Sequence, residues 1–188
     1  MKLSVVMPVF NEAATIAEIL QRVARVDLGS IEKEIVLVDD CSKDATPRIL
    51  REQTHIPNLR VITHAVNGGK GAAIQTALQH ITGDVVIIQD ADLEYDPNDY
   101  GRLVQPIADG KAKVVYGIRD LSSQRWYMAL GNRLVTLATN VLYGVHLHDM
   151  ETCYKAMARE VVDGLRLECR RFDVEAEITA KIIRRGYT

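Results

Sequence analysis

The sequence predicts an α/β fold of the Rossmann-like kind, with a mostly parallel central sheet and helices on both faces. Short apolar runs typical of strands alternate with amphipathic stretches typical of helices, as in successive βαβ units. Three of these runs end abruptly in polar, turn-forming or acidic residues. The chain has 188 residues, of which 47% are hydrophobic, and this is enough for one sizeable core. We therefore expect a single domain over residues 1–188.

The expected strands and helices follow one another in strict alternation through the first two thirds of the chain. The helix after the first strand is indicated by apolar residues at i, i+3, i+4 and i+7, and Asp44 is expected to cap the second helix. The expected strands cover residues 3–7, 35–38, 59–63, 85–88 and 113–117. The expected helices cover residues 13–26, 46–50, 72–80 and a stretch after Pro97.

Residues 85–96 are the most informative stretch, because an apolar run ends in Asp90, Asp92, Glu94 and Asp96. The run is typical of a strand buried on both faces, and ligands of open α/β sheets bind outside the carboxyl ends of such strands. Carboxylate oxygens suit Mg²⁺ or Mn²⁺ shared with a diphosphate. The D-x-D pattern therefore favours a metal held by Asp90 and Asp92. The alternative is a solvated acidic loop that caps the next helix.

A glycine-rich turn, Asn67-Gly68-Gly69-Lys70-Gly71, comes directly before the third expected helix. Glycines at the start of a helix allow a phosphate or ribose to approach the backbone closely, and Lys70 adds a positive charge. Such turns are also frequent without any ligand.

Composition excludes several classes of protein. The formal net charge of −2 gives no reason to expect a nucleic-acid partner. The three cysteines are an odd number without C-x-x-C spacing, which favours a reducing compartment. There is no signal peptide and no apolar run long enough to span a bilayer. A cytoplasmic protein is expected, with a location at the cytoplasmic membrane face left open.

Five short motifs lie at residues 8–12, 38–42, 67–71, 89–92 and 117–119. In order and spacing they resemble those of family 2 glycosyltransferases with the GT-A fold, and most closely the branch of dolichyl-phosphate mannose synthase and other polyprenyl-phosphate glycosyltransferases. Two later blocks, at residues 149–155 and 172–177, resemble that branch too, so the likeness covers nearly the whole chain. Glu94 departs from the glutamine of the mannose synthases, which weakens any transfer of sugar specificity.

The resemblance implies an inverting transfer of a sugar from a GDP- or UDP-linked donor, with a polyprenyl phosphate as the expected acceptor. It implies that Asp40 contacts the base, that Arg119 clamps the diphosphate as a second cation, and that Asp149 is an active-site acid. An ionised phosphate acceptor needs no general base. An alcohol acceptor would need one, and spacing does not rank Asp149, Glu151, Glu175 and Glu177 for that role. The expected donor-site residues are Pro8, Asn11, Glu12, Asp40, Gly69, Lys70, Gly71 and Ala91.

Residues 1–119 are expected to bind the nucleotide sugar, and residues 120–188 to form an acceptor-side half that is shortened at its C-terminus. Residues 125–143 are expected to form a helix whose apolar face packs on the sheet; the alternative is that this helix lies on a membrane surface. Two other functions stay open: a nucleotide-sugar-binding module without turnover, and transfer to a soluble sugar or protein. A phosphotransfer or receiver-type protein is disfavoured, because the D-D pair follows the second strand and no Walker A motif is present.

Overall fold

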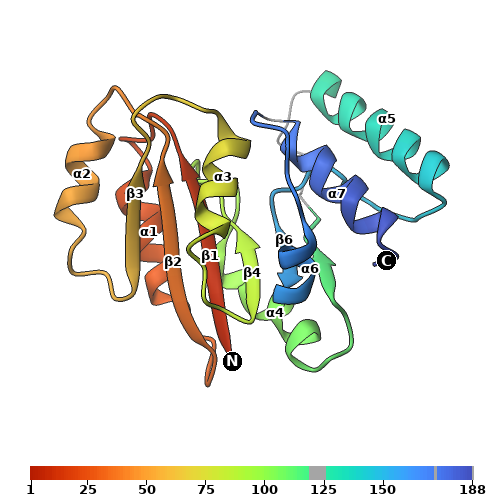
Figure 1. The fold of residues 1–188 in the computed structure, drawn as a ribbon, viewed down its shortest axis with the longest axis horizontal. Helices are drawn as coiled ribbons and strands as arrows, with labels where there is room; N and C mark the ends of the chain where they lie inside the picture. The colour runs from red at the N-terminus through yellow and green to blue at the C-terminus, as the bar shows by residue number, and fades with distance from the viewer. Residues whose placement is uncertain (119–125, 172, 188) are drawn as a thin grey trace.

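The computed structural model describes residues 1–118, 126–171 and 173–187, and for residues 126–129 it describes the backbone alone. Within these residues the chain forms one six-stranded sheet in the order β3-β2-β1-β4-β6-β5 (Figure 1). Figure 1 shows α3 in front of this sheet and α1 behind it. The predicted α/β fold with helices on both faces is confirmed.

The elements of the first half alternate as predicted. They are β1 (Lys2–Val9), α1 (Ile16–Arg25), β2 (Glu32–Asp39), α2 (Thr46–Glu52), β3 (Leu59–Thr63), α3 (Lys70–Leu78) and β4 (Val85–Ile88). The second half is less regular. It contains the 3₁₀ turn η1 (Pro97–Asp99), α4 (Tyr100–Ala108), β5 (Val114–Tyr116), α5 (Trp126–Tyr143), β6 (Lys155–Ala158), α6 (Arg159–Gly164) and α7 (Val174–Arg184).

The sheet is parallel except at β6. β1 pairs in parallel with β2 and β4, so that Val5 lies opposite Ile35 on one side and Ile87 on the other. β6 is antiparallel to both β4 and β5, and it separates these two strands. The sequence analysis did not identify β6, because its residues, Lys-Ala-Met-Ala, include no β-branched or aromatic side chain. β4 is fully buried, as its unbroken apolar run predicts.

The two first helices differ from their predicted starts in small ways. α1 begins at Ile16 rather than residue 13, and its buried face is the predicted stripe of Ile16, Ile19, Leu20 and Val23. The N-cap position of α2 is Ala45, not Asp44. Asp44 still satisfies the helix start, because its Oδ1 accepts the Thr46 amide at 2.9 Å and its Oδ2 accepts the Ala13 amide at 3.1 Å.

Helix α5 corrects the prediction that its apolar face packs on the sheet. Among its described side chains, those of residues 130–143, the two buried ones are polar: Asn132 and Thr136 are 4% and 5% exposed. The large apolar side chains of the same residues are exposed, and Leu137 and Val141 are 59% and 75% exposed. Figure 1 shows α5 at the outer edge of the molecule, beyond α7. None of the helices within the described residues, α5 included, has the length and hydropathy needed to cross a bilayer.

Glu34 joins three segments at the end of the sheet opposite the carboxyl ends of the parallel strands. Its Oε1 accepts hydrogen bonds from Ser4 Oγ and from the Thr82 amide, both at 2.6 Å. Its Oε2 accepts from Thr82 Oγ1 at 2.8 Å and pairs with Lys2 Nζ at 2.6 Å. Burial alone would raise the pKa of Glu34, but these donors favour the ionised carboxylate and lower the pKa to about 2.

Glu34→Gln is expected to destabilise the fold at pH 7 by about 1 to 2 kcal/mol, an amount reduced for solvent screening. The folded-state pKa lies below the unfolded one, so this stabilisation is present above about pH 4.5 and is lost as the pH falls toward 2. Urea unfolding at pH 7 and pH 2.5 measures the difference, with the exposed Glu32→Gln as the control. An equal loss at both pH values would contradict the assignment.

Candidate functional site

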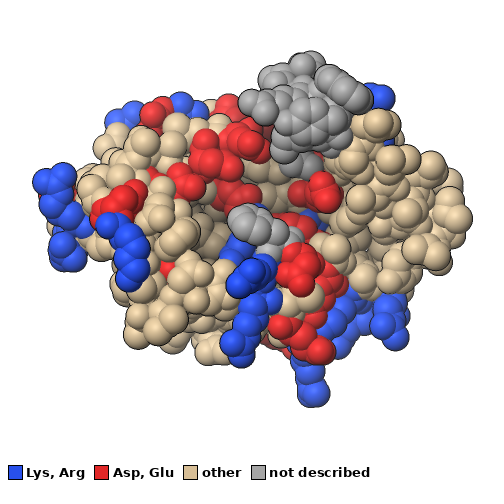
Figure 2. Space-filling model, turned by 90° about the horizontal axis from the view of Figure 1, so that it is seen from above, with Lys and Arg blue, Asp and Glu red and all other residues tan. Residues whose placement is uncertain are grey.

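A cavity of about 390 Å³ lies at the carboxyl ends of β1, β2 and β4. This is the edge of the sheet at which open α/β folds bind ligands. Seen from above, acidic side chains gather on this face of the molecule (Figure 2). The described residues that line the cavity are Pro8, Val9, Phe10, Glu12, Asp40, Asn67, Gly69, Lys70, Ala73, Asp90, Ala91, Asp92 and Arg171.

Most of the predicted donor-site residues meet in this cavity. Asn11, Gly71 and Asp149 are not among the described lining residues, and Arg119 lies outside the described part of the chain. The predicted residues that do line it are Pro8, Glu12, Asp40, Gly69, Lys70, Asp90, Ala91 and Asp92.

The loop after β1 is bound to the loop after β2. The Asn11 amide donates to Ser42 Oγ at 2.8 Å, and Asn11 Oδ1 accepts the Lys43 amide at 2.7 Å. The Glu12 amide donates to Thr46 Oγ1 at 2.9 Å. Asn11 has a φ of 58°, a left-handed conformation that asparagine tolerates better than most residues. Asn11 therefore shapes the cavity wall by joining the two loops.

Asp40 holds the glycine-rich turn in place. Its Oδ1 lies 2.9 Å from the Gly68 amide and 2.6 Å from His64 Nδ1, and its Oδ2 accepts the Gly69 amide at 2.7 Å. Asn67 Nδ2 donates to the Asp40 carbonyl at 3.1 Å. Both carboxylate oxygens of Asp40 thus bind the protein itself, while the residue still lines the cavity. Its predicted contact with the base stays a prediction.

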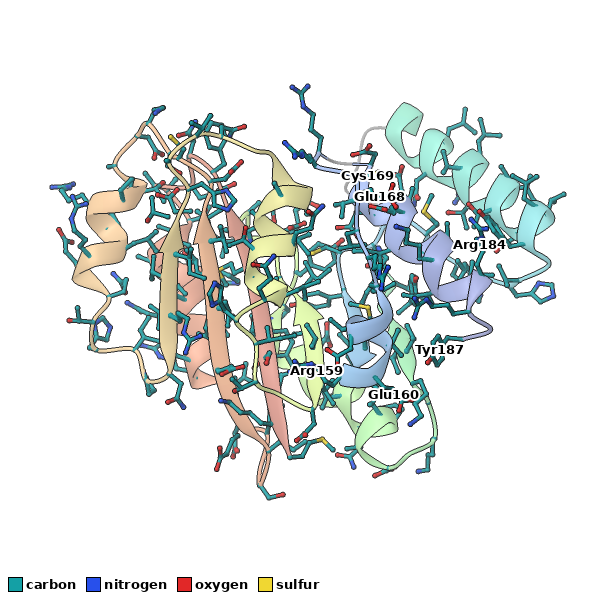
Figure 3. All side chains as sticks on the ribbon, viewed as in Figure 1. Arg159, Glu160, Glu168, Cys169, Arg184 and Tyr187 are labelled. Atoms are coloured by element: carbon teal, nitrogen blue, oxygen red, sulfur yellow. The ribbon has the colours of Figure 1, made fainter. Side chains whose placement is uncertain are left out.

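Two glycines of this turn, Gly69 and Gly71, lie close to the backbone of residues 169–171. A Cβ on Gly69 would lie 2.5 Å from the Arg170 carbonyl oxygen, and one on Gly71 would lie 2.2 Å from the Cys169 carbonyl oxygen. The Ala72 amide donates to the Arg170 carbonyl at 3.1 Å. Figure 3 shows the Cys169 segment on the α7 side of α3. Close approach of residues 169–171 to α3 explains Gly71, and phosphate contact remains a prediction for this turn.

A chain of four alternating charges runs from the cavity into the interior. Lys70 Nζ lies 2.8 Å from Asp90 Oδ1 and 3.0 Å from Glu175 Oε1. Glu175 Oε2 lies 2.6 Å from Nζ of Lys155, which is fully buried. Burial raises the pKa of Glu175, but Lys155 and Lys70 outweigh it and lower the pKa below its ordinary value. Glu175 is therefore an ion-paired carboxylate and is not available as a general base.

Glu177 is also engaged within the fold. Its carboxylate accepts the Glu168 amide at 2.8 Å and the Cys169 amide at 2.9 Å, and it pairs with Lys181 at 2.7 Å. Two of the four candidates for a general base are thus structural. Asp149 is 3% exposed, and its Oδ1 accepts a hydrogen bond from Asn132 of α5 at 3.0 Å.

Asp90 and Asp92 fit a divalent cation that is shared with a ligand. Partial desolvation and the neighbouring Asp90 charge raise the pKa of Asp92, although the Glu94 amide donates to it at 3.1 Å. Among the described residues no three His, Cys, Asp or Glu side chains form a complete metal-binding group. Two carboxylates at a cavity are what Mg²⁺ or Mn²⁺ needs when phosphate oxygens and water supply the other ligands.

The sequence analysis missed Arg171, and it weighed Asp39, which is not among the described lining residues, only as part of the D-D pair. Arg171 lines the cavity because its loop packs on α3, and no local sequence signal places that loop there. Asp39 is 1% exposed; its Oδ1 accepts the Ser42 amide at 3.1 Å, while its Oδ2 has no hydrogen-bond partner in the described part of the chain.

The chain is similar in sequence to known proteins. The family model described as glycosyl transferase family 2 matches residues 4–166. The undecaprenyl-phosphate 4-deoxy-4-formamido-L-arabinose transferase of Edwardsiella ictaluri is 36% identical over 169 residues, which cover 88% of this chain and 51% of that protein. The chain therefore spans about half the length of this curated relative.

Solved structures share the fold. Glucosyl-3-phosphoglycerate synthase from Mycobacterium tuberculosis, in complex with Mn²⁺, UDP and glucosyl-3-phosphoglycerate, superposes with a TM-score of 0.78 at 23% identity, covering 98% of this chain and 66% of that one. S. aureus TarS in complex with UDP has a TM-score of 0.62 at 24% identity, covering 87% of this chain and 48% of that one.

Proposed function

Because the chain belongs to glycosyl transferase family 2, we propose that it transfers a sugar from a nucleotide diphosphate to an acceptor, with the cavity as the donor site. The observation that carries this proposal is the meeting of Asp90, Asp92 and Lys70 in one cavity at the carboxyl ends of the parallel strands. In the Mycobacterium tuberculosis synthase, which shares this fold, UDP is bound together with Mn²⁺ or Mg²⁺.

The proposed donor site would stabilise the negative charge of the leaving diphosphate. Asp90 and Asp92 would hold Mg²⁺ or Mn²⁺, which neutralises charge on a diphosphate leaving group when it is bound. Lys70 and Arg171 line the same cavity and supply positive charge from the protein. Arg119 is proposed as a further clamp. The reaction is proposed to invert the anomeric centre, with the acceptor attacking in line.

The proposed acceptor is a polyprenyl phosphate. The Edwardsiella ictaluri relative is named as an undecaprenyl-phosphate transferase. A phosphate oxygen is already ionised at neutral pH and needs no general base, which agrees with the ion-paired states of Glu175 and Glu177. Asp149, which Asn132 holds in place, is then proposed as an acid that orients groups near the site.

Helix α5 supports a peripheral contact with the membrane that would carry such a lipid. Its outward face is apolar, and its 18 residues include one arginine, Arg133, and no carboxylate. Apolar side chains beside a positive charge suit the headgroup region of an anionic bilayer. The same helix holds Asp149 on its inner face through Asn132, so a lipid surface at α5 would lie next to the proposed acceptor side.

The test of this function offers labelled UDP- and GDP-sugars with a short-chain polyprenyl phosphate, or with soluble sugar and protein alcohols. Transfer to the lipid phosphate is expected. Transfer only to alcohols would overturn the acceptor, and donor binding without any transfer would identify a nucleotide-sugar-binding module.

In vesicles, Leu137→Glu should lower transfer about tenfold, because its exposed position faces the bilayer, while transfer to a detergent-dispersed acceptor should stay unchanged.

A further inference from the structure

Lys70 lies where it competes with a metal ion for Asp90. Its ammonium group is 2.8 Å from both Asp90 Oδ1 and Asp90 Oδ2. The Lys70 and Asp90 side chains are only 14% and 21% exposed, so water screens this pair less than a surface pair. A carboxylate that already has a cation at this distance is a weaker ligand for a second cation.

Neighbouring anions keep Lys70 in its protonated, positively charged form. Burial alone would lower the pKa of Lys70, but the neighbouring acidic groups Cys153, Asp90 and Glu175 raise it above its ordinary value. Burial also raises the pKa of the Cys153 thiol well above its usual range, so this thiol is neutral at pH 7. Asp90 and Glu175 are therefore the anions that keep Lys70 protonated.

The Lys70 ammonium group is attracted by two anions, Asp90 and Glu175. Glu175 lies 3.0 Å from Lys70 Nζ and is itself fixed by the fully buried Lys155 at 2.6 Å. The four charges of Asp90, Lys70, Glu175 and Lys155 sum to zero. A diphosphate in the cavity would add a third anion within reach of Lys70, which lines the same cavity.

We propose that Lys70 is the internal counter-ion of Asp90 and that a nucleoside diphosphate draws it away, so that diphosphate and divalent cation bind cooperatively. Glu175 is a positioning residue in this exchange, because it holds Lys70 between its two possible partners. The proposal rests on the proposed function, since it takes the diphosphate and the metal as ligands of this cavity. Coupling of two ligands is reciprocal: the diphosphate raises metal affinity by the same factor as the metal raises diphosphate affinity.

The test measures the binding of Mn²⁺ alone, by the electron paramagnetic resonance signal of free Mn²⁺. Lys70→Gln is expected to raise the affinity for Mn²⁺ without nucleotide by about fivefold or more, because Asp90 loses its counter-ion. Lys70→Arg retains the charge and should stay near the wild-type affinity.

Lys111→Gln is the matched control, because Lys111 forms a 2.8 Å ion pair with Asp109 on the surface. Asp92→Asn should lose the binding and so identifies the site that is titrated.

Substitution of Glu175 is expected to change the affinity for Mn²⁺ in the opposite direction to substitution of Lys70. In Glu175→Gln, Lys70 loses its ion pair with Glu175 and keeps the one with Asp90, so the affinity for Mn²⁺ without nucleotide should fall about twofold or more. Because that change also leaves the buried Lys155 ammonium group without its carboxylate partner, the double variant Lys155→Met/Glu175→Gln is measured beside it and should show the same fall. A merely structural role of Glu175 would shift the melting temperature and leave Mn²⁺ affinity unchanged.

The titrations are repeated with saturating UDP or GDP. In the wild type the nucleotide should raise Mn²⁺ affinity by about fivefold or more, and in Lys70→Gln by a smaller factor. Unchanged or lower Mn²⁺ affinity of Lys70→Gln without nucleotide would overturn the counter-ion proposal. If neither nucleotide binds the wild type, the proposed function is wrong, and the titration with Mn²⁺ alone still decides whether Lys70 opposes the metal.

Discussion

Asp92→Asn is expected to lower the rate of sugar transfer by about 100-fold or more, with the fold intact. Asp92 lies at the exposed rim of the cavity, so the substitution removes no buried contact. It removes one of two carboxylates that would hold the cation against the leaving diphosphate, where charge stabilisation is usually the largest catalytic effect. Initial rates with Mg²⁺ and with Mn²⁺ measure the loss.

Two controls separate a metal defect from a folding defect. The melting temperature of Asp92→Asn should lie within a few degrees of the wild type. Asp96→Asn changes another carboxylate of the same acidic stretch, one that accepts the Asn98 amide at 3.0 Å and is not among the described lining residues. Its rate should stay near the wild type. Full activity of Asp92→Asn in the presence of a chelator would exclude the metal role.

Gly71→Ala is expected to destabilise the protein by about 1 to 3 kcal/mol, because extra atoms in a packed site force the backbone to move. The new Cβ would lie 2.2 Å from the Cys169 carbonyl oxygen, which cannot rotate away as a flexible side chain could. The displaced segment carries Arg171 into the cavity wall, so donor affinity should fall with stability.

Chemical denaturation and donor titration check this prediction together. Gly101→Ala is the matched control, because Gly101 lies within α4 and a Cβ there would meet nothing within 4 Å. That control should be stabilised by about 0.5 to 1 kcal/mol, as expected for alanine replacing glycine inside a helix. A Gly71→Ala protein as stable as the wild type would show that residues 169–171 are not held against α3.

The sequence was sufficient to predict the parts of the fold whose signal is local. Val85–Ile88 is an unbroken apolar run and forms a central buried strand, and Ile16 and Val23 belong to a stripe that packs in the core. The acidic residues at the end of this strand reach the cavity for the same reason, since the carboxyl ends of parallel strands share one edge.

The parts that could not be predicted depend on tertiary contacts. Lys155 begins a strand without β-branched residues, and its buried ammonium group is paired with Glu175 of α7, a contact that no local sequence signal predicts. Asn132 and Thr136 look like the solvent face of α5, yet their hydrogen bonds to Asp149 and the Met150 amide turn that face inward. The spacing of apolar residues identifies a helix and does not say which face the protein covers.

The most direct measurement of the central claim is an anomalous-scattering map from crystals of the protein soaked with Mn²⁺ and UDP or GDP. The account predicts one manganese peak within coordinating distance of the Asp90 and Asp92 carboxylates, with the diphosphate in the cavity beside Lys70. Nucleotide in the cavity with manganese bound elsewhere would contradict the metal site. Nucleotide bound away from the carboxyl ends of β1, β2 and β4 would contradict the donor site itself.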